Sequence, residues 1–268
     1  MEKLNNFYQY KFILIYALRD LKRNYKKISS IIITLFISLF ILSAIFTIED
    51  SLKKELKENA KELLGGDLEI DYNRNQGNID LLNKVEEFTT ISEMVEFSTM
   101  LSTTNRKKNK SLFTRIKTVD QKYPLYGEVT YEPANAYERM QNEPYTILIN
   151  ESLSKTLNIK TNEIVKIQDQ EFLVIGKVRS VPDVSGFVTF GDWVLTGKQT
   201  LDILKLKGIG NFLNYEYKVK FNNNDNPEII IKKIESIFKD DQKVKIRYPE
   251  NAASGLKRVI GNFSQFLS

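Results

Sequence analysis

The feature that most constrains this chain is a run of 21 residues without a charged side chain, Ile28–Ile48. As an α-helix with a rise of about 1.5 Å per residue, it would be roughly 31 Å long, which is the thickness of a membrane's hydrocarbon core. A cleavable signal peptide is the alternative, but its apolar region is only about 7–15 residues long and ends at a small-x-small site. The residues at the end of the run, Thr47–Asp50, are a poor cleavage site. The run therefore predicts an uncleaved transmembrane helix over residues 28–48.

The charges on either side of this run predict its orientation. Acidic Glu49 and Asp50 follow it, and five basic residues precede it: Arg19, Lys22, Arg23, Lys26 and Lys27. The positive-inside rule then places residues 1–27 in the cytoplasm and the chain after Glu49 outside it. Residues 12–25 carry apolar side chains at helical spacing with basic ones between them, which is typical of an amphipathic helix on anionic lipid. A merely solvated positive flank is the plainer alternative.

The net charge of +5 belongs wholly to this cytoplasmic arm. Residues 1–27 hold seven basic and two acidic side chains, and the rest of the chain holds 32 of each. A sequence pI near 9 would otherwise suggest nucleic-acid binding. Because the body of the protein is neutral, we expect no nucleic-acid partner.

Small polar residues recur inside the predicted span. Ser30, Thr34 and Ser38 follow one another every four residues. Such a row lets transmembrane helices approach closely and form hydrogen bonds with each other. The alternative is that each hydroxyl bonds back to its own helix. The row predicts that the span packs against other membrane helices. The bond within one helix stays open as the alternative.

The helical pattern continues beyond the membrane surface as a predicted stalk over residues 49–66. Its apolar residues fall within an arc of about 120° on a helical wheel and require a packing partner: Leu52, Leu56, Ala60 and Leu63. Gly65 and Gly66 then end the helix, because glycine favours the position just past a helix C-terminus.

The far end of the chain repeats this arrangement. In residues 251–268 apolar side chains recur every three and four residues, and no Gly, Asn or Pro closes the pattern before Ser268. We expect a second stalk helix that returns to the membrane, in a chain that is truncated.

Residues 67–250 predict a mixed α+β domain. Strand patterns at 67–72 and 91–103 flank a helical pattern at 79–88. A second strand–helix–strand unit covers 215–221, 227–238 and 244–248. One such unit at each end indicates a split βαβ, ferredoxin-like lobe with a β-rich lobe, residues of about 125–210, inserted between its halves. Further patterns indicate a strand at 112–119, a strand at 145–149, a helix at 151–157 and a hairpin at 164–178.

The composition excludes most enzyme chemistry. The chain has neither His nor Cys, so it offers no Ser-His-Asp triad, thiol nucleophile, disulfide or zinc ribbon. It contains no glycine-rich loop that would cradle phosphates. The carboxylates are scattered and are expected on solvated faces: Glu163, Asp169, Glu171, Asp183, Asp192 and Asp202. We therefore predict no catalytic residue, no cofactor site and no metal site.

Four segments together resemble the FtsX/MacB-type ABC transporter permeases. They are Ala17–Leu21 (ALRDL), Leu63–Ile70 (LLGGDLEI), Ile116–Gly127 (IKTVDQKYPLYG) and Ile147–Val178, which is similar to the family's extracytoplasmic core domain. The third segment is similar to the YbbP branch in particular. The chain departs from the family at Asn162-Glu163, where Gly-Asp is common, and at Gly191-Asp192, where Gly-Pro is frequent.

This resemblance implies a permease subunit in the bacterial cytoplasmic (inner) membrane, with residues 67–250 as its periplasmic core domain. Such subunits work with a separate cytoplasmic ABC ATPase, so the chain itself is not expected to be an enzyme. The family acts by mechanotransmission, in which stalks carry ATP-driven motion to the periplasmic domain. Relatives of the YbbP branch are associated with export or extraction of lipids or other hydrophobic compounds. The implied partners are the ATPase, the remaining permease helices or a second permease copy, the lipid bilayer and periplasmic proteins.

A protein of another class fits the same observations. A single-span membrane sensor or adaptor would also have one apolar helix and an extracytoplasmic domain that binds a ligand or a partner. The coding sequence after Ser268 separates the two hypotheses. Further apolar spans in the same reading frame indicate a permease, and a stop codon without a neighbouring ATPase gene indicates the sensor.

Overall fold

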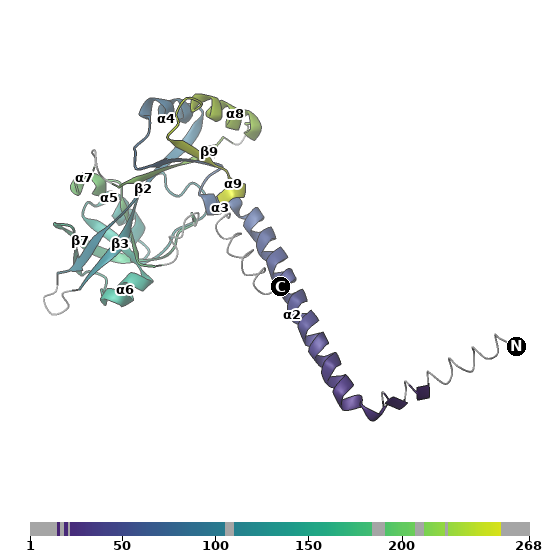
Figure 1. Cartoon of the computed structure of the whole chain (residues 1–268). Helices are drawn as coiled ribbons and strands as arrows, with labels where there is room; N and C mark the ends of the chain where they lie inside the picture. The colour runs from purple at the N-terminus through teal and green to yellow at the C-terminus, as the bar shows by residue number, and fades with distance from the viewer. Residues whose placement is uncertain are drawn as a thin grey trace. The chain divides into compact units, whose positions relative to one another are not determined.

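A computed structural model describes residues 15–16, 19–20, 22–104, 110–183, 191–206, 212–222 and 225–252. The chain divides into two compact units, and each is described by itself. The first comprises Met1–Lys54 with Val259–Ser268, and most of one long helix lies in it. The second, Glu55–Arg258, contains the sheet (Figure 1).

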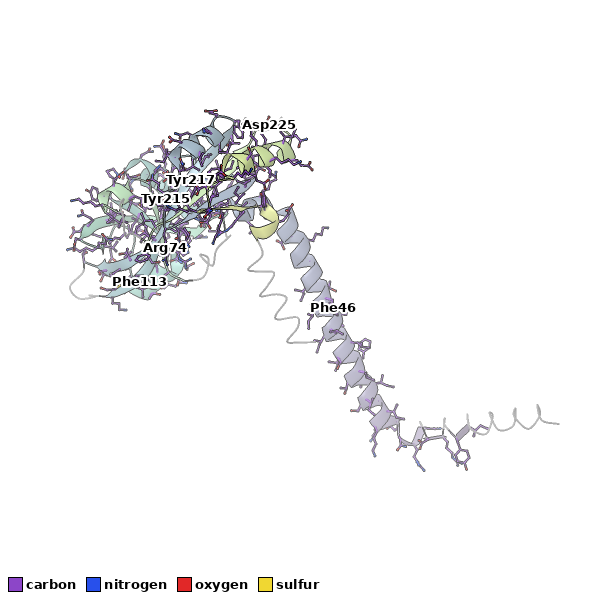
Figure 2. All side chains as sticks on the ribbon, turned by 45° about the horizontal axis from the view of Figure 1, so that its top comes forward. Phe46, Arg74, Phe113, Tyr215, Tyr217 and Asp225 are labelled. Carbon is purple, nitrogen blue, oxygen red and sulfur yellow. The ribbon has the colours of Figure 1, made fainter. Side chains whose placement is uncertain are left out.

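The long helix α2 covers Tyr25–Glu58 and includes the predicted span. Its segment Tyr25–Ile48 is long and apolar enough to cross a membrane, with a mean hydropathy of 2.8 over its most apolar window. None of the side chains in that window is buried inside the protein. Phe46, for example, is exposed on this helix (Figure 2). By length and composition, α2 has the properties that the sequence predicted for residues 28–48.

A short break separates α2 from the next helix. Asn59 has backbone angles of φ −98° and ψ 15°, outside the α-helical range, and α3 covers Ala60–Leu64. Gly65 ends α3 in the left-handed conformation with φ +77°. The expected stalk over residues 49–66 is therefore made of two helical pieces, because the backbone at Asn59 leaves the helical path.

The described residues of the sheet unit form ten strands in one hydrogen-bonded network. The strands are β1 (Leu68–Asn73), β2 (Thr89–Thr103), β3 (Ser111–Val119), β4 (Thr130–Glu132), β5 (Thr146–Asn150), β6 (Ile164–Ile167), β7 (Gln170–Ser180), β8 (Trp193–Gly197), β9 (Asn214–Phe221) and β10 (Val244–Arg247). The remaining helices are α4 (Ile79–Glu86), α5 (Ala136–Asn142), α6 (Glu151–Leu157), α7 (Thr200–Ile203), α8 (Pro227–Ile237) and α9 (Pro249–Ala252). Along the sheet the order is β10-β1-β9-β2-β3-β8-β5-β7-β4, and β6 pairs with β2 and β7.

The first and last parts of this unit form the split lobe, which comprises β1, α4, β2, β9, α8 and β10. Its strands run in the order β10-β1-β9-β2 with every neighbouring pair antiparallel. The helices α4 and α8 lie side by side next to these strands (Figure 1). This is the βαββαβ arrangement of a ferredoxin-like lobe, and the predicted α+β fold class is confirmed.

The inserted lobe comprises β3 to β8 with α5, α6 and α7. β3 pairs antiparallel with β2 along nine residues and parallel with β8 on its other side. The expected limits of this lobe are about 125–210. In the described part of the chain, β3 precedes these limits and still pairs with β8 of the inserted lobe.

Side-chain caps and apolar spacing explain the helices that cover the split lobe. The Asn78 side chain accepts hydrogen bonds from the backbone N–H groups of Asp80 and Leu81 at the start of α4. Asn226 caps α8 in the same way, and Pro227 occupies the first helical position. Ile230 and Ile234 lie one turn apart on α8 and are buried in the main core.

Candidate functional site

The two faces of the split lobe's sheet differ in chemistry. Alternate side chains of a strand point to opposite faces. One face is apolar and packs under α4 and α8, with Ile70 and Val219 completely buried in its core. On the other face, here called the polar face, the register places Glu69 opposite Lys218 on β9 and opposite Arg247 on β10. Charged groups are thus brought together by strand pairing between distant parts of the sequence.

Lys218 is the centre of the first charged cluster. Its Nζ lies 2.5 Å from Oε2 of Glu69 and 2.9 Å from Oε2 of Glu216. The side chains of Lys218 and Glu69 are 1% and 0% exposed. Arg247 closes the cluster, since its guanidinium lies 2.8 Å from Oε1 of Glu69 and 2.5 Å from Oδ2 of Asp71. Each buried charge in this cluster therefore has an opposite charge in contact.

Lys117 and Asp183 form a second buried ion pair. Nζ of Lys117 on β3 lies 2.5 Å from Oδ2 of Asp183, which follows β7. The hydroxyl of Tyr123 donates to the other oxygen of Asp183. Asp183 is only 2% exposed. The expectation that this carboxylate is solvated is therefore wrong, because the fold brings it against a lysine 66 residues away.

Asp67 connects the end of α3 to both lobes. It follows Gly65 and Gly66, and its Oδ1 lies 2.6 Å from Nζ of Lys61 on α3. Its Oδ2 accepts hydrogen bonds from the hydroxyl of Tyr126 at 2.7 Å and from the backbone N–H of Phe221 on β9 at 2.8 Å. One carboxylate therefore links a helix, a loop of the insertion and a central strand.

Gly65 brings the end of α3 against the two charged clusters. A Cβ atom at this position would lie 3.0 Å from Cβ of Asp183 and 3.6 Å from Cδ of Lys218. The contact with Asp183 is tight, so a side chain at this position would require the neighbouring atoms to shift. We call the whole set the charged junction, and its members are Asp67, Glu69, Asp71, Lys117, Asp183, Glu216, Lys218 and Arg247.

The electrostatics of the junction favour a fixed charge on Lys218. Burial alone would lower the pKa of its ammonium group, but the carboxylates of Glu216 and Glu69 raise that pKa above its usual value. Burial and the negative charge of Asp183 raise the pKa of the Tyr123 hydroxyl, so this group stays protonated as a donor. No group of metal-ligating side chains occurs in the described part of the chain. The contacts of the junction are ion pairs and hydrogen bonds that link α3 to the sheet.

The predicted stalk residues lie partly at this junction. Ala60 is buried and Leu63 is half-buried, while the neighbouring Leu64, which the helical wheel did not include, is completely buried. The side chains of Leu52 and Leu56 lie outside the described residues. Stalk packing through these two residues stays a prediction.

The predicted membrane residues are exposed in the first unit. The hydroxyl of Thr34 donates to the carbonyl oxygen of Ser30 at 2.9 Å, which is the bond within one helix considered above as the alternative. Ser38 is exposed in the same helix. The basic side chains of the arm are also exposed: Arg19, Lys22, Arg23, Lys26 and Lys27. The roles of these residues in helix packing and topology stay predictions. The expected returning helix covers residues 251–268, and the part of it after the end of α9 lies outside the described residues.

Sequence reasoning missed the charged junction, although one signal was present. Glu69 and Asp71 interrupt an otherwise apolar strand, and Lys218 does so in β9. Charged residues at every second position of two strands indicate a common face. Without the pairing of β1 with β9, however, nothing identifies the partners.

The fold is that of a periplasmic domain of a MacB-type transporter. The periplasmic region of MacB from Actinobacillus actinomycetemcomitans superimposes with a TM-score of 0.51 at 15% identity, over 74% of this chain and 94% of that one. The extracellular domain of the noncanonic ABC-type transporter YknZ from Gram-positive bacteria gives a TM-score of 0.46 at 8% identity, over 67% of this chain and 98% of that one.

At the level of sequence, the chain is similar to the uncharacterized ABC transporter permease YbbP of Escherichia coli (strain K12). The two are 23% identical over 169 residues, which is 63% of this chain and 20% of the relative. No protein-family model matches the chain. The resemblance to FtsX/MacB-type permeases is confirmed by this relative together with the MacB fold.

Proposed function

We propose that this chain is a membrane subunit, a permease, of an ABC transporter and that it works by mechanotransmission. The similarity to YbbP and the MacB-like fold support the class. The charged junction supports the mechanism. A helix that transmits force has to end on structure that does not yield, and α3 ends on buried, fully paired charges that link it to both lobes.

The contacts of α3 with the sheet would oppose its displacement. Moving α3 away from the sheet would separate Lys61 from Asp67 and open the packing of Gly65 against Asp183. Because the Lys61 side chain is 58% exposed, this ion pair contributes less than the roughly 3–5 kcal/mol of a fully buried pair. Displacement of α3 that keeps these contacts would move the lobes with it.

The remaining features of the proposal follow from the resemblance and from the charge distribution. The N-terminal arm is cytoplasmic, and the sheet unit is extracytoplasmic in the bacterial inner membrane. A separate cytoplasmic ATPase supplies the energy, so this subunit is not an enzyme. Further permease helices or a second copy complete the membrane part, and periplasmic proteins are expected partners. The cargo class is a lipid or another hydrophobic compound.

The topology can be tested directly because the chain has no cysteine. Single replacements Lys22→Cys and Lys155→Cys would each provide one exposed thiol. A membrane-impermeant maleimide should label Lys155→Cys in cells with a permeabilised outer layer, and Lys22→Cys only after lysis. The reverse pattern would contradict the proposed orientation.

The mechanism is tested by Asp67→Asn in the complete transporter. An amide keeps the size of the side chain but removes its charge. The loss of charge weakens the contact with Lys61 and the hydrogen bonds that Oδ2 accepts from Tyr126 and Phe221. ATP hydrolysis should continue, while transport per ATP hydrolysed should fall by about tenfold, equivalent to about 1.4 kcal/mol.

The matched control is Asp225→Asn, at an exposed loop position (Figure 2). This variant should keep both activities. Transport by Asp67→Asn at the level of Asp225→Asn would refute the role of the junction. A chain that never associates with a cytoplasmic ATPase during purification from its native membrane would instead favour a sensor or adaptor.

A further inference from the structure

At the other end of the polar face, the sheet unit contains a cavity of about 380 Å³. It lies where β1 ends and β9 begins, and it extends across β2 to β3. Its lining residues are Asn73, Arg74, Glu96, Phe97, Ser98, Phe113, Arg115, Phe212 and Asn214. An adjoining hollow of about 250 Å³ shares Ser98, Phe113 and Arg115 and reaches Asp192 and Trp193. Cavities of roughly 300–1,000 Å³ are the usual size of small-molecule sites.

The cations of this cavity differ from those of the charged junction. Arg74 and Arg115 have no ion pair with any residue that the structure describes, whereas Lys117 and Lys218 on the same sheet are fully paired. Figure 2 shows Arg74 and Phe113 on the sheet unit. Glu96 lines the same cavity, and the charge of Arg115 acts on it, although the described side chains of the two form no ion pair. The cavity thus holds two guanidinium groups against one carboxylate, and the arginine fork matches the carboxylate of a bound anion.

Two aromatic rings border the same cavity. Phe113 is 67% exposed and Phe212 is 72% exposed. The guanidinium carbon of Arg74 lies 4.9 Å from the centre of the Phe212 ring, which places the cation against an aromatic face. Exposed aromatic side chains beside unpaired arginines are the composition of binding surfaces rather than of ordinary solvent-exposed strands.

We propose that this cavity binds an organic carboxylate that carries an aromatic group, as an N-acylated aromatic amino acid or the carboxyl end of a peptide does. The carboxylate contacts Arg74 and Arg115, and the ring lies against Phe113 and Phe212. The site does not depend on the proposed transport function, because binding requires only the sheet unit of this chain.

The chain carries its own reporter for this site. Trp193 is its only tryptophan and lines the adjoining hollow. Intrinsic fluorescence of the full chain in detergent should therefore change saturably when N-acetyl-phenylalanine is added. Three comparison probes separate the contributions: N-acetyl-phenylalanine amide lacks the carboxylate, acetate lacks the ring, and a peptide with a blocked carboxyl end and an internal Asp-Phe pair separates a terminal from an internal carboxylate.

We expect N-acetyl-phenylalanine to bind at least about tenfold more tightly than its amide or acetate. Arg115→Gln and Phe212→Ala should each weaken binding by about tenfold or more. Phe212 is mostly exposed, so its replacement tests the site without disturbing the fold. The matched control Arg179→Gln, at an exposed arginine paired with Glu132, should bind as the unchanged chain does.

Three results would overturn the proposal. The first is no saturable change with N-acetyl-phenylalanine or the peptide up to about 10 mM, a range that covers millimolar dissociation constants. The second is equal binding of the acid and its amide. The third is binding that Arg115→Gln and Phe212→Ala leave unchanged. Tighter binding of the internal Asp-Phe peptide than of N-acetyl-phenylalanine would assign the site to a protein segment and reject a free or terminal carboxylate.

Discussion

The two faces of the split lobe bury side chains of opposite kinds. The face under α4 and α8 is an apolar core, with Ile234 completely buried. The polar face buries charges, with Lys218 held between carboxylates. Apolar packing is non-directional and tolerates adjustment, whereas a buried ion pair is stable only in one geometry. The comparison suggests that the apolar face supplies stability and that the polar face fixes how α3 meets the lobes.

The largest expected effect is that of Lys218→Met. The variant keeps a long apolar side chain but leaves Glu69 and Glu216 buried without their cation. We expect a loss of about 3–5 kcal/mol in the free energy of unfolding, measured by chemical denaturation. Lys155→Met, at an exposed pair with Glu151, should change it by less than about 0.5 kcal/mol. Similar losses in the two variants would show that the buried cluster contributes no more to the free energy of unfolding than an exposed ion pair does.

Ile234→Ala provides the corresponding test of the apolar face. Removing a completely buried side chain of this size loses apolar burial and leaves a cavity, so we expect a loss of about 2–4 kcal/mol. The control Ile229→Ala lies on the same helix at a residue that is 64% exposed and should have an effect within about 0.5 kcal/mol. A loss greater than that of Lys218→Met would show that the cavity left at Ile234 destabilises the fold more than the unpaired carboxylates at Lys218 do.

Glu96 makes the stability of the polar face dependent on pH. Burial is the main reason that the pKa of Glu96 is raised from 4.5 to about 7. The positive charges of Lys117 and Arg115 oppose this rise, and the negative charges of Glu216 and Asp183 add to it. The native state therefore holds its proton up to a higher pH than the unfolded state, and stability falls as the pH rises from about 4.5 to about 7.

Glu96→Gln should remove this dependence. At about pH 8 the variant should be more stable than the unchanged chain by on the order of 1–3 kcal/mol, and near pH 4 the two should agree. Thermal unfolding at both pH values measures the difference. Glu138→Gln, at an exposed carboxylate, serves as the control and should show no such change. A constant difference at every pH would indicate a packing effect rather than titration.

The smallest expected effect concerns the contact between α3 and the polar face. Gly65→Ala places a side chain at φ +77° and 3.0 Å from Asp183, which should destabilise the fold by about 1–2 kcal/mol. Gly191→Ala is the comparison, because its φ is +108° and no atom lies within 4 Å. A greater loss of stability for Gly65→Ala than for Gly191→Ala would be due to the packing of α3 against Asp183. Equal losses in the two variants would mean that the backbone conformation alone is the cause.

Local patterns were sufficient to predict the membrane helix and most of the split lobe. Uncharged length identified Ile28–Ile48, which lies within the apolar segment Tyr25–Ile48, and alternation or helical spacing identified α4, α8 and β9. These signals are local, because each depends on neighbouring residues along the chain. The elements that were missed are short or lack alternation. β8 (Trp193–Gly197) is buried on both faces, and α7 (Thr200–Ile203) has only four residues.

The candidate site could not be predicted because it depends on long-range pairing. Lys218 contacts Glu69 across 149 residues, and Lys117 contacts Asp183 across 66. In the sequence each of these residues is an ordinary charge between apolar neighbours. Only the strand order decides whether such a charge is solvated, as was expected for Asp183, or buried against a partner.

The strand order also has a consequence for how the protein is made. Both neighbours of β1, namely β9 and β10, come from the far end of the sheet unit. While the ribosome is still producing the insertion, β1 has no strand on either edge, and Asp67 beside it lacks the backbone N–H of Phe221. The insertion must therefore be synthesised before the split lobe can close. A newly made α3 is attached to a finished domain only when the last strand has emerged.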